Sequence, residues 1–234
     1  MQKEQINKLV RKNILSLKPY SSARDEFSGT DGVFLDANEN PFGELNRYPD
    51  PHQQELKQKL SAIKNMPVSS IFVGNGSDEV IDLTYRIFCN PGKDKALTFT
   101  PTYGMYEVSA EINDVELIKI PLTTDFQIDF DALENHLGDE TLKLIFICSP
   151  NNPTANNLDN IEAVLQKFNG IVIVDEAYID FSTSGSFLNK IEQYPNLIVM
   201  QTFSKAWGLA AARVGMAYSN ELIISHYNKV KPPY

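Results

Sequence analysis

Ile171-Val172-Ile173-Val174 and Leu144-Ile145-Phe146-Ile147 are two short runs in which every residue is apolar. A strand with one face in water alternates apolar with polar residues, so a continuous run of this length indicates a strand covered on both faces. Between the two runs, residues 161–168 place apolar side chains at the three- and four-residue spacing of one helix face, and Asn169-Gly170 suits a C-terminal cap of that helix. This alternation predicts an α/β fold with a mostly parallel sheet sandwiched by helices.

The same alternation continues along the chain and predicts its domain organisation. Residues 31–234 are predicted to form one large domain, whereas residues 1–30 are polar, too few for a domain, and expected to pack as an arm. The chain ends at Lys231-Pro232-Pro233-Tyr234, straight after a helical pattern, which favours a fragment of a longer chain. Further strands are predicted over 71–73, 96–99, 115–120, 197–200 and 215–218, and further helices over 77–88 and 106–112.

Composition narrows the classes of function. The 234 residues carry 21 Lys and Arg against 30 Asp and Glu, a net charge of −9, which disfavours binding to nucleic acid or to anionic membranes. No run approaches the roughly 18 apolar residues of a membrane-spanning helix, and the N-terminus lacks the apolar core of a secretory signal. Cys89 and Cys148 lie in apolar surroundings, as expected of reduced core residues in a cytoplasmic protein.

Val73-Gly74-Asn75-Gly76-Ser77-Asp78-Glu79 carries a predicted strand through two glycines into a predicted helix. Such a turn exposes backbone N–H groups at the start of the helix, and these groups bind anions. The glycine spacing is neither that of G-x-G-x-x-G nor that of a Walker A loop, so binding of an ordinary nucleotide ranks last among the functional hypotheses. Taken alone, the segment is better explained as a plain turn with a helix cap.

Two further polar segments follow the apolar runs directly. Ser149-Pro150-Asn151-Asn152-Pro153-Thr154 comes after one run and Asp175-Glu176-Ala177-Tyr178 after the other, at strand ends where open α/β sheets bind ligands. A carboxylate at the end of a buried strand needs a partner to stay ionised, and a cationic ring nitrogen would serve. The alternatives are a plain turn for the first segment and a helix N-cap for Asp175.

Lys205 and Arg213 lie in a third such segment, Thr202 to Gly215, among small and apolar residues. A lysine in these surroundings can have a lowered amine pKa and act as a nucleophile, although most lysines are merely solvated. An arginine there is expected to pair with a buried anion such as phosphate.

In their order along the chain these segments resemble the pyridoxal-phosphate-dependent aminotransferases of fold type I, and within them most closely the histidinol-phosphate aminotransferase family. The resemblance covers essentially the whole chain and implies the large domain of that fold, with the family's C-terminal small-domain segment missing. Beside the segments above, it rests on Asn38-Glu39-Asn40-Pro41-Phe42-Gly43, Arg47-Tyr48-Pro49-Asp50, Pro101-Thr102-Tyr103-Gly104-Met105-Tyr106 and the extension Ile179-Asp180-Phe181.

The resemblance assigns roles to single residues. Lys205 would hold pyridoxal phosphate as a Schiff base and then move the proton between substrate and cofactor, while Asp175 would keep the pyridine nitrogen protonated. Asn152 and Tyr178 would bind the 3-hydroxyl oxygen of the ring, and Tyr178 is counted with the catalytic residues. Tyr103 would stack on the ring, and the phosphate would be held by Asn75, Gly76, Ser77, Ser204 and Arg213.

The resemblance also implies a homodimer, because the family's counterpart of Tyr48 reaches the phosphate in the neighbouring subunit's site. Tyr20 and Asn38 are expected on the substrate side. Simple packing or surface exposure is the alternative for the three aromatic residues Tyr20, Tyr48 and Tyr103. No arginine follows Arg213, so the family's C-terminal arginine that grips the substrate has no counterpart, and the histidines show no metal-ligand spacing.

The implied activity is transfer of an amino group between L-histidinol phosphate and 2-oxoglutarate, giving imidazole acetol phosphate and L-glutamate in histidine biosynthesis. Related chemistries on the same motifs remain open, namely threonine-phosphate decarboxylation and aromatic amino-acid transamination, because Lys205 and Asp175 serve either. A module that binds pyridoxal phosphate without turnover is the alternative from another class.

Overall fold

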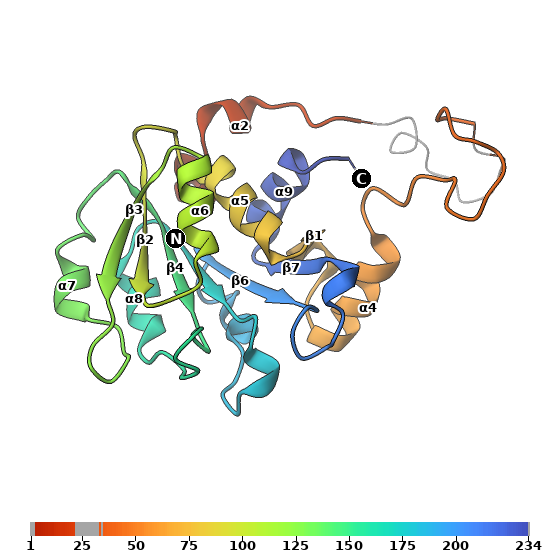
Figure 1. Ribbon diagram of the computed structural model, residues 1–234. Helices are drawn as coiled ribbons and strands as arrows, with labels where there is room; N and C mark the ends of the chain where they lie inside the picture. The colour runs from red at the N-terminus through yellow and green to blue at the C-terminus, as the bar shows by residue number, and fades with distance from the viewer. Residues whose placement is uncertain (1–2, 22–32, 34, 234) are drawn as a thin grey trace.

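The computed structural model describes residues 3–21, 33 and 35–233, and their strands form one seven-stranded sheet in the order β1-β7-β6-β5-β4-β2-β3 (Figure 1). β7 runs antiparallel to its neighbours β1 and β6, and the other neighbouring pairs are parallel, which confirms the mostly parallel sheet. The strands are β1 (Ile71–Asn75), β2 (Lys95–Thr100), β3 (Glu116–Pro121), β4 (Leu142–Cys148), β5 (Ile171–Asp175), β6 (Leu197–Thr202) and β7 (Val214–Tyr218).

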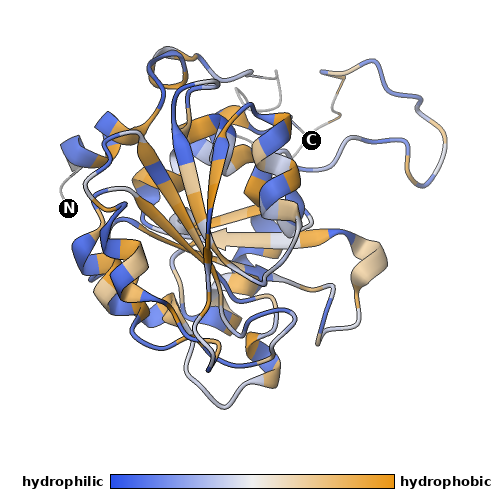
Figure 2. Cartoon of the chain, turned by 60° about the vertical axis from the view of Figure 1, so that its left-hand side comes forward, coloured by the Kyte–Doolittle hydropathy of each residue, from blue (hydrophilic) through white to orange (hydrophobic). Residues whose placement is uncertain are grey.

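Helices cover both faces of this sheet, as the apolar runs predicted (Figure 2). Along β5, Ile171 and Ile173 enter one hydrophobic core and Val172 and Val174 enter the other, so the alternation of the pleat fills two cores from one run. On the first face lie α1 (Lys3–Leu9), α2 (Lys12–Ser16), α5 (Ser77–Phe88), α6 (Met105–Ile112) and α9 (Glu221–Val230), and on the second α4 (Gln54–Lys64), α7 (Phe130–Glu134) and α8 (Ile161–Lys167). Short 3₁₀ turns are η1 (Val68–Ser70), η2 (Ile179–Phe181), η3 (Phe187–Lys190) and η4 (Ala210–Ala212).

The arm packs on the first face. Ile6, Val10 and Ile14 are buried there, and the Lys229 amine of α9 donates to the Ile14 carbonyl at 3.1 Å. The predicted boundary after residue 30 falls outside the described residues. Within the described part of the chain, no helix combines the length and the apolarity needed to cross a membrane.

One local expectation was wrong. α8 ends at Lys167, and its cap residue Phe168 is extended, so Asn169-Gly170 does not form the glycine cap. Gly170 has another reason to lack a side chain: a Cβ there would lie 2.5 Å from the Lys143 carbonyl oxygen and 2.3 Å from the Phe168 ring. The glycine therefore permits close packing where β5 begins beside β4.

A second close approach shapes the sheet edge near the predicted site. A Cβ on Gly215 of β7 would lie 2.2 Å from the backbone of Gly76 and Ser77, which is closer than atoms can pack. The Gly76 N–H also donates to the Arg213 carbonyl at 2.9 Å. Together these contacts press the N-terminus of α5 against the segment that carries Arg213.

Gly215→Ala is expected to destabilise the fold by about 1–3 kcal/mol, because the methyl group must displace backbone rather than a flexible side chain. Gly185→Ala is the matched control, since a Cβ at that exposed position meets nothing within 4 Å, and its effect should stay within about 0.5 kcal/mol. Urea unfolding measures both. Equal stability of the two variants would contradict the role of the close approach.

Candidate active site

A cavity of about 120 Å³ lies where the carboxyl ends of β4, β5 and β6 meet the N-terminus of α5. Parallel strands end at the same edge of a sheet, so side chains distant in sequence gather there. The cavity is lined by Ser77, Asp78, Tyr103, Cys148, Asn152, Asp175, Ala177, Tyr178, Thr202, Ser204, Lys205 and Arg213. The structure thus brings together most of the residues that the sequence pointed to.

Asp175 is the last residue of β5 and is 3% exposed. Its Oδ2 accepts a hydrogen bond from the Tyr106 hydroxyl at 2.6 Å, and its Oδ1 accepts one from the Ala177 N–H at 3.0 Å. Burial raises the pKa of Asp175 to about 6, although both hydrogen bonds and the charge of Lys205 oppose that rise. The alternative that Asp175 caps a helix is wrong, because the chain continues as a turn into η2, whose cap residue is Tyr178.

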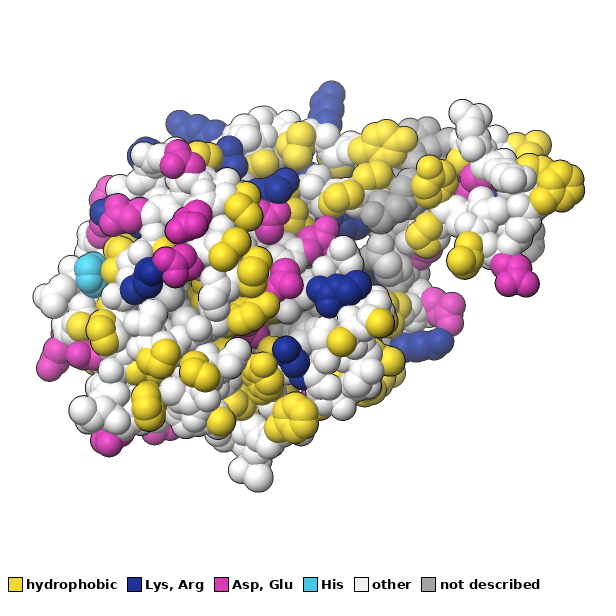
Figure 3. Space-filling model, in the orientation of Figure 1, with side chains coloured by type: hydrophobic (Ala, Val, Ile, Leu, Met, Phe, Trp, Pro, Cys, Tyr) yellow, Lys and Arg dark blue, Asp and Glu magenta, His cyan; other side chains and the backbone are white. Residues whose placement is uncertain are grey.

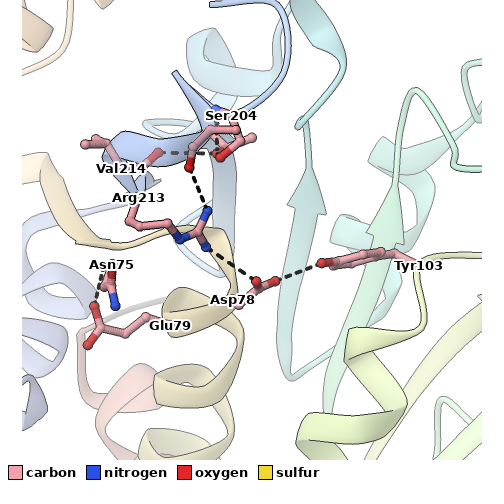
Figure 4. Close-up of polar contacts among 9 residues, drawn as sticks. Asn75, Asp78, Glu79, Tyr103, Ser204, Arg213 and Val214 are labelled. Carbon is pink, nitrogen blue, oxygen red and sulfur yellow. Dashed lines mark hydrogen bonds and ion pairs between the residues drawn. The ribbon is translucent and has the colours of Figure 1, made fainter. Parts of the chain in front are cut away.

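The N-terminus of α5 and Arg213 form a cradle for an anion on another wall of the cavity (Figure 4). Arg213 has a left-handed backbone, with φ at 51°, and its Nη1 donates to the Ala210 carbonyl at 3.2 Å. Gly76 leaves room for the guanidinium, because a Cβ there would lie 2.3 Å from Nη2. The N–H groups at the start of α5, the Ser204 hydroxyl and the Arg213 guanidinium are a donor set suited to phosphate.

Asp78 takes part in this cradle, which the sequence analysis missed. Its Oδ2 lies 3.8 Å from the Arg213 Nη2, and its Oδ1 accepts a hydrogen bond from the Tyr103 hydroxyl at 2.9 Å. Burial, with the Asp78 carboxylate second, raises the pKa of Tyr103 to about 12. The charged neighbour of Arg213 among the described residues is this half-buried carboxylate, and the Arg213 side chain is 46% exposed. Pairing of Arg213 with a buried anion such as phosphate stays a prediction.

Lys205 lies in the turn after β6 at the mouth of the cavity. Its Nζ is 5.4 Å from the centre of the Tyr178 ring. The expected apolar surroundings are not found, because the side chain is exposed. Tyr178 and Asn152 also line an adjoining hollow of about 560 Å³.

Five of the predicted residues lie outside the cavity lining, and Gly76, which is buried beside Arg213, is one of them. Asn75 is exposed at the end of β1, where its N–H donates to the Glu79 carboxylate. Tyr20, Asn38 and Tyr48 are exposed as well, with Tyr48 at 52%. Asn38 and Tyr48 belong to the loop of residues 35–50, which extends to the right in Figure 1.

Tyr106 is the other functional candidate that the sequence analysis missed. It lies in the first turn of α6, three residues after Tyr103, which precedes that helix. The sequence could not indicate the contact of its hydroxyl with Asp175, because Asp175 lies far away in the sequence.

The comparisons with known proteins agree with this geometry. Residues 26–234 match the family model "Aminotransferase class I and II". The chain belongs to this family. It is 56% identical to the histidinol-phosphate aminotransferase of Cytophaga hutchinsonii, over 98% of the chain and 68% of that relative, and 56% identical to that of Bacteroides fragilis strain YCH46, over 98% and 67%.

Solved structures of aminotransferases share the fold. The histidinol-phosphate aminotransferase of Sinorhizobium meliloti in complex with pyridoxal-5'-phosphate matches with a TM-score of 0.73 and 25% identity, over 80% of this chain and 52% of that one. That of Clostridium acetobutylicum matches with a TM-score of 0.72 and 25% identity, over 81% and 57%. The chain therefore spans about two thirds of the length of its curated aminotransferase relatives and just over half of these structures.

Asp175→Asn is expected to stabilise the cofactor-free chain at pH 8 by about 1–3 kcal/mol, because the amide carries no charge to bury. The raised pKa means that the folded state binds the Asp175 proton more tightly than the unfolded state does. Wild type therefore loses stability relative to the variant as the pH rises from about 4 to about 6, and the difference vanishes below pH 4.

Urea unfolding of both proteins between pH 4 and 8 measures this difference. Asp159→Asn, at an exposed aspartate, is the control and should differ from wild type equally at every pH. A difference for Asp175→Asn that is independent of pH would contradict the assigned cost of burial.

Asp78→Asn is expected to tighten the binding of inorganic phosphate by up to about fivefold, since a half-exposed ion pair with Arg213 is worth about 0.2–1 kcal/mol. Asp82→Asn is the matched control, because Asp82 lies one turn further along α5 and pairs with Arg86 at 2.9 Å. Calorimetric titration at fixed ionic strength measures both affinities. The same gain in both variants would show a general charge effect and not a local one.

Proposed function

We propose that this chain is the cofactor-binding part of a histidinol-phosphate aminotransferase. It would transfer an amino group between L-histidinol phosphate and 2-oxoglutarate, giving imidazole acetol phosphate and L-glutamate, in histidine biosynthesis in the cytoplasm. The observation that carries the reaction class is the convergence in one cavity of a buried carboxylate, an amine and an anion cradle. The relatives that are 56% identical to the chain over their aligned parts supply the choice of substrates.

The residues present fit pyridoxal phosphate. Gly76 keeps the cradle open beside Arg213, which suits the phosphate group. Asp175 is a buried carboxylate whose pKa of about 6 reflects an incompletely compensated charge, and a cationic ring nitrogen would compensate it. The Lys205 amine stands at the same cavity and suits an aldehyde.

When bound, pyridoxal phosphate supplies an aldehyde carbon that accepts amines and a ring that withdraws the electron pair left on the substrate Cα. Asp175 would keep a proton on the ring nitrogen by accepting its hydrogen bond. Lys205 would hold the cofactor covalently and, once released, carry the proton from the substrate Cα. Asn152 and Tyr178 would bind the 3-hydroxyl oxygen, and Tyr103 would cover the ring. Phosphate would be held by Asn75, Gly76, Ser77, Ser204 and Arg213.

A homodimer completes the proposed site. Tyr48 lies outside the cavity lining of its own chain and is half-exposed, and in the proposed dimer it would contact the phosphate in the second copy's site. The loop that carries it also exposes Leu35, Phe42 and Leu45, each by more than 80%, and Figure 3 shows hydrophobic side chains on this loop at the right. A second copy would cover such apolar area. Tyr20 and Asn38 are proposed for the substrate side of the assembled site.

The test is the visible absorption spectrum of the chain with pyridoxal phosphate, before and after addition of L-histidinol phosphate. A protein-bound band that the substrate converts to the cofactor's amine form is expected, and Lys205→Ala should lose the attachment that borohydride fixes. Lys167→Ala, at a lysine on α8 that pairs with Glu134, is the control and should keep it.

Each other outcome selects an alternative. A stable band that ignores histidinol phosphate would leave a module that binds the cofactor without turnover. Release of CO₂ from phosphothreonine would identify a decarboxylase instead. Failure to bind pyridoxal phosphate at all would overturn the proposed function.

A further inference from the structure

Tyr106 lies outside the cavity lining, and its hydroxyl contacts the active-site residue Asp175. The residue belongs to α6 and is fully buried, and its OH donates to the Asp175 Oδ2 at 2.6 Å. Tyr106 does not line the cavity, whereas Asp175 does. The hydroxyl contacts Asp175, and the neighbouring Cys148 thiol, from outside the cavity lining, so the cavity side of Asp175 is open to a ligand.

Aromatic rings pack around the Tyr106 ring, which carries this hydroxyl. The Tyr106 ring stacks on Phe146 of β4, with centroids 4.9 Å apart and planes at 21°, and meets Tyr103 edge to face at 5.8 Å. The Tyr85 hydroxyl of α5 donates to the Tyr106 backbone carbonyl at 2.9 Å, and the Tyr85 ring packs on the other side of the cluster against Phe146. Ring packing against Phe146 and Tyr103 therefore holds the Tyr106 side chain, whereas the Tyr85 hydroxyl contacts the Tyr106 backbone.

The other groups that face Asp175 do not replace the hydroxyl. Asp78 on α5 raises the pKa of Asp175 through its negative charge, and Lys205 beyond β6 lowers it. Cys148 on β4 stays a neutral thiol at physiological pH, because burial raises its pKa to about 12. Burial raises the pKa of Tyr106 well above its ordinary value, so the phenol remains a donor. Among the described residues, the Ala177 N–H is the second hydrogen-bond donor to the Asp175 carboxylate.

From this geometry we propose that Tyr106 is a positioning residue that keeps Asp175 ionised and fixed at the cavity wall, ready to accept the hydrogen bond of a cationic ring nitrogen. The proposal rests on the function proposed above for the identity of that ring. It extends the site by a residue that touches neither cofactor nor substrate and acts only through Asp175.

Tyr106→Phe tests the proposal, because it deletes one oxygen atom and keeps the ring in its cluster. Tyr85→Phe is the matched control: it also deletes a buried phenol oxygen beside Phe146, but this hydroxyl bonds to a backbone carbonyl and not to Asp175. The first measurement is an infrared titration of the protonated Asp175 carboxyl in the cofactor-free chain, with the band assigned by its loss in Asp175→Asn.

The titration midpoint of wild type is expected near pH 6. Tyr106→Phe should raise it by about one pH unit, the size expected for loss of one hydrogen bond to a charged group, and Tyr85→Phe should leave it in place. An unchanged midpoint in Tyr106→Phe, or an equal shift in both variants, would overturn the proposal. This measurement needs no cofactor, so it decides the role of Tyr106 even if pyridoxal phosphate does not bind.

The second measurement is the affinity for pyridoxal phosphate at pH 6.5 relative to pH 8.5. A midpoint raised from about 6 to about 7 lowers the ionised fraction at pH 6.5 about threefold, so Tyr106→Phe should lose about threefold more affinity between the two pH values than Tyr85→Phe does. Equal pH dependence in the two variants, with the infrared shift present, would overturn the link between Tyr106 and cofactor binding.

Discussion

The structure depends on a parallel sheet that is covered by helices on both faces. β4, β5 and β6 lie in the interior of the sheet, and their side chains fill the two cores alternately. A polar side chain in the middle of such a strand is buried and costs free energy unless it finds a hydrogen-bond partner. The ends of the strands are therefore the favoured places for polar side chains that bind a ligand. Asp175, the residues after Cys148 and the turn after Thr202 meet at one edge for this reason.

The antiparallel strand β7 positions Arg213 in the site. It returns the chain from the Lys205 turn beside β1, and the contact of Gly215 with Gly76 sets Arg213 against the start of α5. A guanidinium and a helix N-terminus then share one anion cradle. This close approach requires a glycine on each side, Gly76 at the start of α5 and Gly215 on β7.

Much of the fold could be predicted from the sequence because its signals are local. The apolar runs and the spacing of residues in 77–88 predicted β5 and α5, and α5 has those bounds in the structure. The cap at Asn169-Gly170 was wrong because a local turn pattern cannot reveal a neighbouring strand, here the Lys143 carbonyl against Gly170. Tyr106 and Asp78 were missed for the same reason, since their partners Asp175 and Arg213 come from distant segments. The exposure of Lys205 likewise follows from the turn's position and not from its composition.

The charges of the cavity also argue for the kind of ligand it takes. Asp175 on one wall is a buried carboxylate whose charge the protein compensates only in part, and Arg213 with the start of α5 on another wall offers positive potential. A ligand that is only an anion would bind in the cradle but would leave the charge of the Asp175 carboxylate uncompensated. Its negative charge would also repel that carboxylate. A ligand with a phosphate at one end and a cationic ring nitrogen at the other would satisfy both walls, and by neutralising Asp175 it would recover the cost of burying that carboxylate. This separation of charge favours pyridoxal phosphate over an ordinary nucleotide phosphate, independently of any motif.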